Sequence, residues 1–264
     1  MEEVRVENVS FAYKDKLERW ILKDINLKTN AGEFVCILGQ SGCGKSTLLR
    51  LLAGLEKPID GSIWFGDKEV KGAGLDRGVV FQDYGLFPWM TAGENILLAL
   101  KQKHPKKDKE KLKKIALEML DKVGLHAEEV YKKLPKALSG GMKQRCAIAR
   151  SLSVNPPVLL MDEPFGALDA VTRAKLQDLL LDLREQEEVK KSIFFVTHDV
   201  DEAVYLADRV VVLGQYPSSI IYECSLPNKK RVTREEQFEN HELIQFRNTL
   251  IHQINMDVAK HSDS

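Results

Sequence analysis

The stretch FVCILGQSGCGKST, residues 34–47, decides the fold. Its first five residues form a continuous apolar run, which is typical of a strand buried on both faces of a sheet. The next eight, residues 39–46, fit the pattern GxxxxGK[ST] in full. Leucines at helical spacing follow within residues 46–55. A strand, a glycine-rich loop and a helix therefore come in the order that a phosphate-binding site requires.

The residue types of the loop predict its chemistry. Glycines let the backbone turn tightly, so that consecutive N–H groups point at phosphate oxygens, and the dipole of the following helix favours negative charge. Lys45 is expected to reach the β- and γ-phosphates of a nucleoside triphosphate, and Ser46 is expected to ligate Mg²⁺. The alternative is a glycine-rich turn that binds nothing. We predict nucleotide contacts from Gly39, Gln40, Ser41, Gly42, Cys43, Gly44, Lys45, Ser46 and Thr47.

Length and composition are those of an ordinary globular chain. The 264 residues suffice for one large domain or two small ones, and 44% are hydrophobic and 30% charged. Basic and acidic residues balance at 39 each, so nothing indicates nucleic acid as a partner. The four cysteines include no pair at CxxC spacing, and neither a disulfide framework nor a zinc site is expected.

Membrane insertion is not expected. No apolar run approaches the roughly 18–20 residues that span a bilayer. The first ten residues, MEEVRVENVS, are acidic and lack the apolar core of a signal peptide. We therefore expect the chain to stay in the cytosol.

Short strand-like runs alternate with longer helical runs, which favours an α/β core with parallel strands. Alternating patterns at residues 4–13 and 63–65 favour antiparallel strands instead. Further core strands are predicted at residues 78–81, 158–161, 192–197 and 209–213.

A helical insert interrupts this alternation. Residues 90–136 contain no strand signal, and residues 108–123 place apolar side chains on one helix face. We predict an ATPase domain at 1–214 with a helical subdomain inserted at 90–150, and a C-terminal extension at 215–264. Within the extension we expect a short strand at 220–222, a charged helix at 234–254 and a frayed end at 257–264.

A second motif is VLLMDE, residues 158–163, in which four apolar residues run into two acids. Asp162 suits Mg²⁺ coordination, and Glu163 could polarise an attacking water. A third is LSGGMKQR, residues 138–145, in which Ser139 is placed to cap a helix. Physical chemistry alone leaves an ordinary capped helix as an equal alternative for this third motif.

The three motifs, in this order and spacing, resemble those of an ABC transporter ATPase, and the resemblance covers roughly residues 4–213. It implies a P-loop NTPase core of mostly parallel sheet, an N-terminal antiparallel β subdomain and an inserted α-helical subdomain. It also implies that Ser139, Gly140 and Gly141 contact ATP bound to a second subunit.

Four further positions match the family pattern. Tyr13 matches the aromatic residue that stacks on adenine, with a core aromatic as the alternative. Gln82 matches the glutamine that senses Mg²⁺ and the attacking water. Asp169 ends the loop that crosses the dimer interface and contacts nucleotide, and His198 matches the switch histidine at the γ-phosphate. The resemblance thus implies Glu163, His198, Gln82 and Lys45 as catalytic residues, and Ser46, Gln82 and Asp162 as Mg²⁺ ligands.

Two positions depart from the family pattern. Met142 stands where the signature segment usually has glutamine, and a thioether cannot donate an amide's hydrogen bonds. Gly166 stands where the loop before Asp169 often has serine. The first departure puts contacts to the partner's nucleotide in doubt.

One copy of each motif implies a homodimer that sandwiches two ATP molecules. Without membrane spans of its own, the chain is expected to sit at the cytoplasmic side of the membrane on separate permease subunits. Residues 83–89 are a candidate for the docking groove, or else a hydrophobic patch internal to the lobe. An extracytoplasmic solute-binding protein is an indirect partner.

Segments 86–91, 164–169 and 197–203 resemble the nitrate/sulfonate/taurine importer branch, so we expect ATP-driven import of such solutes. Two alternatives are a soluble ABC-type ATPase acting on nucleic acid or ribosomes, and a binding module without hydrolysis. The chain lacks the fused second unit or long coiled coil typical of the first, and its intact catalytic residues disfavour the second. Substrate contacts lie on other subunits, so this sequence does not identify the cargo.

Overall fold

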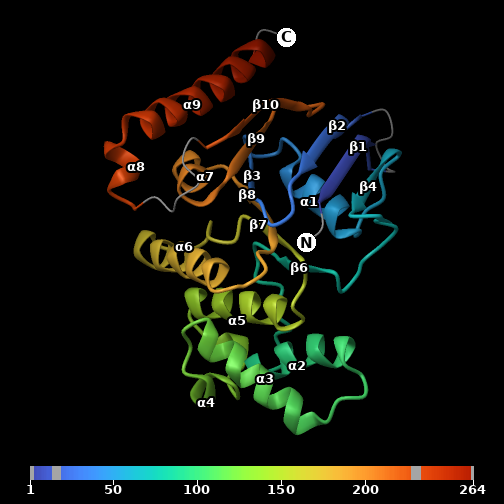
Figure 1. The fold of residues 1–264 in the computed structure, drawn as a ribbon, viewed down its shortest axis with the longest axis vertical. Coiled ribbons are helices and arrows are strands. Elements are labelled where there is room, and N and C mark those ends of the chain that lie inside the picture. The colour runs from blue at the N-terminus through green and yellow to red at the C-terminus, as the bar shows by residue number, and fades with distance from the viewer. Residues whose placement is uncertain (1–2, 14–18, 227–232, 263–264) are drawn as a thin grey trace. The chain divides into compact units, whose positions relative to one another are not determined.

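The computed structural model describes residues 3–13, 19–226 and 233–262 (Figure 1). The chain forms two compact units. Unit 1 comprises Met1–Gly74 and Val189–Ser264, and unit 2 comprises Leu75–Glu188.

An antiparallel sheet of unit 1 contains β1 (Val4–Phe11), β2 (Leu22–Thr29), β4 (Asp60–Phe65) and β5 (Lys68–Glu69), in the order β2-β1-β4-β5. The antiparallel pairing of β1 with β4 confirms the prediction for both segments. Strand β2 was not predicted. Its backbone at Asp24 has a φ of 51°, and its register against β1 shifts, so its apolar residues do not alternate strictly.

The core of unit 1 is built on β3 (Phe34–Leu38), all five residues of which are buried. It pairs in parallel with β8 (Ser192–Thr197) and β9 (Arg209–Leu213). Strand β10 (Ile220–Ser225) lies antiparallel to β9, and it is longer than predicted. Helix α1 (Lys45–Ala53) contacts β8, and α7 (Val200–Leu206) contacts β3 and β8. Burial on both faces explains why β3 reads as an unbroken apolar run.

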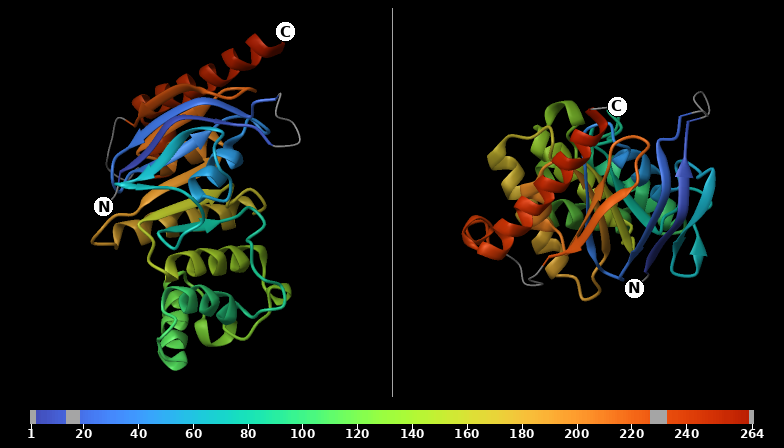
Figure 2. Two further views of the ribbon diagram at one scale, coloured as in Figure 1. Left: turned by 90° about the vertical axis from the view of Figure 1, so that its right-hand side faces the viewer. Right: turned by 90° about the horizontal axis from the view of Figure 1, so that it is seen from above.

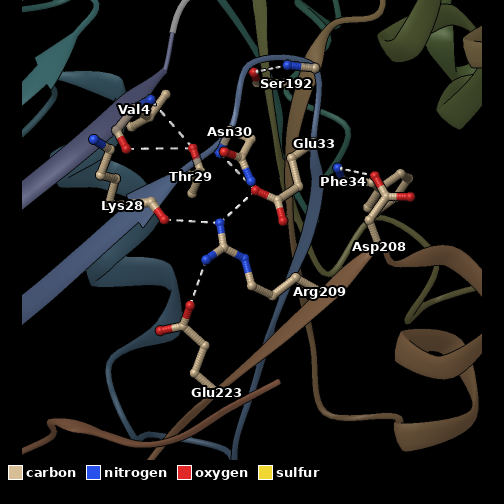
Figure 3. Close-up of polar contacts among 11 residues, drawn as sticks. Val4, Lys28, Thr29, Asn30, Glu33, Phe34, Ser192, Asp208, Arg209 and Glu223 are labelled. Atoms are coloured by element: carbon tan, nitrogen blue, oxygen red, sulfur yellow. Dashed lines mark hydrogen bonds and ion pairs between the residues drawn. The ribbon is translucent and has the colours of Figure 1, made fainter. Parts of the chain in front are cut away.

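Arg209 joins four strands at the end of β3 where the chain enters (Figure 3). Its Nη2 donates to the carbonyl oxygen of Lys28 at 2.9 Å and to Oε2 of Glu33 at 2.5 Å. Its Nη1 donates to Oε1 of Glu223 at 2.5 Å. This cluster ties β2, β3, β9 and β10 together at the end opposite the glycine-rich loop, which follows the other end of β3.

Unit 2 contains the parallel pair β6 (Arg77–Val80) and β7 (Val158–Asp162). Its helices are α2 (Ala92–Lys103), α3 (Lys109–Lys122), α4 (Ala127–Val130), α5 (Gly140–Ser153) and α6 (Ala170–Glu185), with a 3₁₀ turn at Pro135–Ala137. Helices α2, α3 and α5 pack on one another, and α5 also contacts β6 and α6. Residues 90–136, all of which the structure describes, contain no strand, as predicted. The predicted α/β class with parallel core strands, an antiparallel sheet and added helices is confirmed.

The C-terminal segment folds into α8 (Glu236–Glu239) and α9 (His241–Ser262), the red helices of Figure 2. Helix α9 contacts α7 and α8. The predicted frayed end at 257–264 is wrong as far as residue 262, because α9 continues there and Asp257 bonds to the backbone N–H of Gln215. Residues 263–264 lie outside the described part. None of the helices that the structure describes is long and apolar enough to cross a membrane.

Candidate nucleotide site

The predicted site residues are divided between the two units. Unit 1 contains Tyr13, the loop at residues 39–47 and His198. Unit 2 contains Gln82, Ser139, Gly140, Gly141, Asp162, Glu163 and Asp169.

Gly44 shapes the start of α1. Its φ of 95° lies in the left-handed region, and a Cβ there would lie 2.9 Å from Cδ2 of Leu22. Only glycine suits such a position. As the N-cap of α1, Gly44 has no side chain that could accept from the first-turn amides. The start of α1 is therefore suited to bind an anion.

Lys45 points back into the loop. Its side chain is buried, and Nζ donates to the carbonyl oxygens of Gly39 at 3.0 Å and Gln40 at 2.8 Å. A buried ammonium group is tolerated only where polar groups compensate for lost hydration. The loop thus holds a positive charge among its own carbonyl groups, in a position suited to phosphate oxygens.

Tyr13 lies beside the start of α1. Its Oη is 3.3 Å from Oγ1 of Thr47, and its ring stands edge-on to Phe11 with centroids 4.9 Å apart. The residue is 39% exposed, so part of the ring remains available for stacking. The structure therefore places Tyr13 next to the loop and outside the core.

His198 is exposed directly after β8 and faces a cavity of about 480 Å³ beside the loop. One wall comes from the loop and another from α9. The lining residues are Gly39, Gln40, Ser41, His198, Val200, Ile251, Ile254 and Asn255. The structure thus places His198 in the same cavity as the phosphate loop and adds α9, which the sequence did not place there. Its role at the γ-phosphate stays a prediction.

The acidic pair lies at the end of β7. Residues 158–161 are buried, whereas Asp162 and Glu163 are half-buried. Glu163 has a φ of 40°, and its carbonyl oxygen accepts from the N–H of Gly166 at 3.2 Å. A glutamate in this sparsely populated region costs on the order of 1–3 kcal/mol, and such conformations cluster at functional sites. The tight turn thus follows directly after the buried part of the strand, where Asp162 and Glu163 are partly accessible.

The signature segment starts α5. Ser139 is the N-cap, and its Oγ accepts from the N–H of Met142 at 3.3 Å. A Cβ on Gly141 would lie 2.6 Å from Cγ2 of Thr172 in α6. The second glycine of the segment is therefore required by close packing, independently of any nucleotide.

Unit 2 also brings three predicted motifs together at Gly140. A Cβ on this residue would lie 3.2 Å from Oη of Tyr84 and 3.3 Å from Cδ2 of Leu168. Asp169 follows as the N-cap of α6 and accepts from the N–H of Thr172 at 3.0 Å, which lowers the pKa of its carboxyl group. The signature segment thus lies beside both the segment after the predicted sensor glutamine and the loop before Asp169.

Gln82 is exposed two residues after β6, and the segment after it is held by Arg150. Nη1 of Arg150 donates to the carbonyl oxygen of Gly85 at 2.6 Å, and Nη2 donates to that of Tyr84 at 3.4 Å. Burial lowers the pKa of the Arg150 guanidinium. Sequence reasoning missed this residue. The available signal was a cationic side chain within the otherwise apolar run CAIARSL.

Asn95 organises the rest of that segment and was also missed. It is fully buried, accepts from the N–H of Phe87 at 2.8 Å and donates Nδ2 to the carbonyl oxygen of Thr91 at 3.0 Å. A polar residue on the buried face of a predicted helix was the signal. It fixes the loop that carries Phe87 and the 71% exposed Trp89.

Residues 22–166 match the family model described as ABC transporter. This chain belongs to the ABC transporter family. It is an ATPase of this family, and the predicted resemblance is confirmed.

Two curated relatives cover most of the chain. The bicarbonate transport ATP-binding protein CmpD of a Synechocystis species is 43% identical over 92% of this chain and 86% of its own length. The nitrate import ATP-binding protein NrtD of Synechococcus elongatus is 44% identical over 86% of this chain and 81% of its own length. Both are similar to this chain along most of their lengths.

Among solved structures, the dimeric, post-hydrolysis state of the ATP-binding cassette MJ0796 bound to ADP and Pi is 35% identical, with a TM-score of 0.75. The match covers 85% of this chain and 99% of the MJ0796 chain. The cbiO1 protein of Clostridium perfringens, part of an ABC transporter complex, is 28% identical with a TM-score of 0.73, over 95% of this chain and 96% of that chain.

Proposed function

We propose that this ATPase powers import of a small inorganic anion, of the nitrate or bicarbonate class, across the cell membrane. The observation that carries the proposal is the similarity to nitrate and bicarbonate import ATP-binding proteins at 43–44% identity over 86–92% of the chain. Sulfonates and taurine, which are organic, are a second candidate class of cargo on the weaker basis of motif resemblance.

Different residues of the chain bind ATP and promote its hydrolysis. Lys45 and the amides at the start of α1 bind the phosphates, and Tyr13 stacks on the adenine. Glu163 accepts a proton from the attacking water, and Gln82 and His198 orient the reacting groups. Their function is to hold the water in line with the γ-phosphate and to stabilise the charge that develops there.

The donor set fits Mg²⁺. The half-buried carboxylate of Asp162 ends a strand, and the hydroxyl of Ser46 lies in the first turn of α1. Mg²⁺ prefers oxygen ligands and usually takes only one or two carboxylates, with phosphates and water completing the shell. Ser46, Asp162 and Gln82 would hold the ion, which neutralises charge on the β- and γ-phosphates when bound.

The chain supplies one copy of each motif, so we propose that it acts as a homodimer with two ATP molecules at the interface. Ser139 and the glycine amides of one copy then contact the ATP of the other. The dimeric cassette structure supports this arrangement.

Separate permease subunits would hold the ATPase at the cytoplasmic side of the membrane, with a solute-binding protein acting outside it. The exposed side chain of Trp89, whose ring lies 5.5 Å from that of Phe87, is the proposed permease contact. Exposed aromatic residues of this kind are favoured at protein interfaces.

Glu163→Gln tests the function. The variant should bind ATP normally and lose turnover by about 10²- to 10⁴-fold, because an amide cannot accept the proton of the attacking water. Cells that depend on this chain should then lose uptake of labelled nitrate or bicarbonate. Glu118→Gln, on the exposed face of α3, is the matched control and should change neither quantity.

Two results would contradict the proposal. Near-normal ATPase activity in Glu163→Gln would remove Glu163 as the base. Lost ATPase activity with unchanged uptake of both anions would remove the assigned cargo and leave another solute, or a soluble role of the ATPase, in its place.

A further inference from the structure

The turn between β9 and β10 lies along the phosphate loop. Oγ of Ser218 donates to the carbonyl oxygen of Cys43, near the end of the loop. Nε2 of Gln215 donates to Oε1 of Gln40 at 3.2 Å, near its start. The turn therefore contacts the loop at two points, on either side of Gly42.

Helix α9 holds this turn through Asp257. Oδ2 of Asp257 accepts from the backbone N–H of Gln215 at 2.6 Å. The side chain of Asp257 is only 13% exposed, and its Oδ1 is 3.7 Å from Nδ1 of His261. A largely buried, charge-assisted hydrogen bond of this kind is stronger than a neutral one. The backbone of Gln215, near the start of the turn, is thus held by the C-terminal helix.

Further contacts join the C-terminal helices α8 and α9 to α7. Nε of Arg247 lies 2.5 Å from Oδ1 of Asp201, and Nε2 of Gln237 donates to the carbonyl oxygen of Asp201 at 2.6 Å. Asp201 lies three residues after His198, in the first turn of α7. Helix α9 therefore contacts the turn beside the phosphate loop, and α8 and α9 both contact α7, the helix that follows His198.

The chain of contacts ends at the ATP-binding lysine. The side chain of Gln40 accepts a hydrogen bond from Gln215, and its backbone carbonyl oxygen accepts one from Nζ of Lys45 at 2.8 Å. Each link joins adjacent groups: Asp257 to Gln215, Gln215 to Gln40, and Gln40 to Lys45.

We propose that the C-terminal segment is a positioning element of the ATP site, in which Asp257 fixes the phosphate loop through Gln215 and Gln40. None of these C-terminal residues touches nucleotide in this scheme. They restrict the conformations of the loop, so that ATP binds to a loop that is already ordered. The inference rests on ATP binding by the loop and is independent of the transported solute.

The test compares Asp257→Ala with Asp257→Asn in the full chain. The alanine variant removes the acceptor, and we expect KM and Kd for ATP to rise about three- to tenfold, as for loss of one strong hydrogen bond, with kcat at saturating ATP within twofold. The asparagine variant keeps a carbonyl oxygen that can accept from Gln215, and it should restore both values to within twofold of the parent. Gln245→Ala, at an exposed position of α9, is the control and should change nothing.

Kinetics separate positioning from simple loss of fold. Unfolded or inactive protein lowers the apparent kcat and leaves KM unchanged, so that pattern in Asp257→Ala would overturn the proposal. Equal effects of alanine and asparagine, or an unchanged Kd in both, would also overturn it.

Two further variants decide the question if Asp257→Ala does not fold. Gln215→Ala keeps the backbone N–H and removes only the contact to Gln40, and Arg247→Ala removes a half-exposed anchor. Each should raise KM for ATP about two- to threefold. Unchanged KM in both variants would overturn the proposal.

Discussion

Helices α1 and α5 both start at the glycines of a sequence motif, yet their first turns differ: α1 follows Gly44, whereas Gly140 and Gly141 are the first two residues of α5. The N-cap of α1 is Gly44, which has no side chain, and the buried Lys45 follows. The N-cap of α5 is Ser139, whose Oγ accepts from an amide of its own helix. The first cation of α5, Lys143, is the fourth residue of its helix, and its Nζ lies 6.0 Å from the ring of Tyr84.

The two helix N-termini are therefore suited to different functions. Helix α5 satisfies one of its first amides with its own cap, so it is stable without a ligand. Helix α1 has a cap that supplies no acceptor and a lysine buried among carbonyl groups, so an anion completes it. The first is suited to present a preformed surface to a partner, and the second is suited to bind phosphate within its own subunit.

The largest expected effect is the difference in ATP affinity between Lys45→Ala and Lys143→Ala. Lys45→Ala should raise Kd for ATP roughly tenfold to a hundredfold, because charge-assisted hydrogen bonds contribute about 1.5–3 kcal/mol. Lys143→Ala should leave Kd of the isolated chain within twofold. Titration with a fluorescent ATP analogue measures both, and similar losses in the two variants would break the comparison.

The next effect concerns the ring beside α1. Tyr13→Ala should weaken ATP binding by about 1–3 kcal/mol if the ring stacks on adenine as aromatic residues do on other bases. Tyr13→Phe keeps the ring and loses only the contact to Thr47, so it should bind ATP within twofold of the parent. Unchanged affinity in Tyr13→Ala would make the ring a structural element only.

A matched pair of glycine substitutions sharpens the distinction between binding and partner contact. Gly44→Ala places a Cβ at a φ of 95° and should cost about 1–2 kcal/mol of ATP affinity. Gly141→Ala, crowded by Thr172, should lower ATPase activity and leave ATP affinity of the isolated chain unchanged. Calorimetric titration and a phosphate-release assay separate the two, and a loss of ATP affinity in Gly141→Ala would contradict the assignment.

The smallest effect is expected at the cap of α5. Ser139→Ala should lower the free energy of unfolding by about 1 kcal/mol, because the N–H of Met142 loses its acceptor. Ser139→Asn keeps a capping oxygen and should retain stability, which urea unfolding would measure. If the asparagine variant is stable but still slow in ATP hydrolysis, the hydroxyl has a role beyond capping.

Local pattern was sufficient to predict most core elements and to select the residues of the candidate site. The apolar runs of β3 and β8 predict those strands with their bounds, because burial on both faces leaves no polar alternation. The spacing of Gly39, Gly44 and Lys45 predicts a phosphate loop, because the backbone geometry of such a loop is a local property. Strand β2 escaped prediction, since a bulge at Asp24 interrupts its period of two.

Contacts between distant segments required the tertiary structure. No pattern near Arg150 or Asn95 indicates that they hold the segment after Gln82, and nothing near Asp257 indicates that it holds a turn about 40 residues earlier in the chain. Hydrogen bonds of this kind depend on where strands and helices place the chain in space. The sequence by itself predicted a phosphate-binding loop and the acids that accompany it, whereas the tertiary structure decided which distant side chains contact that loop, because such contacts depend on the path of the whole chain.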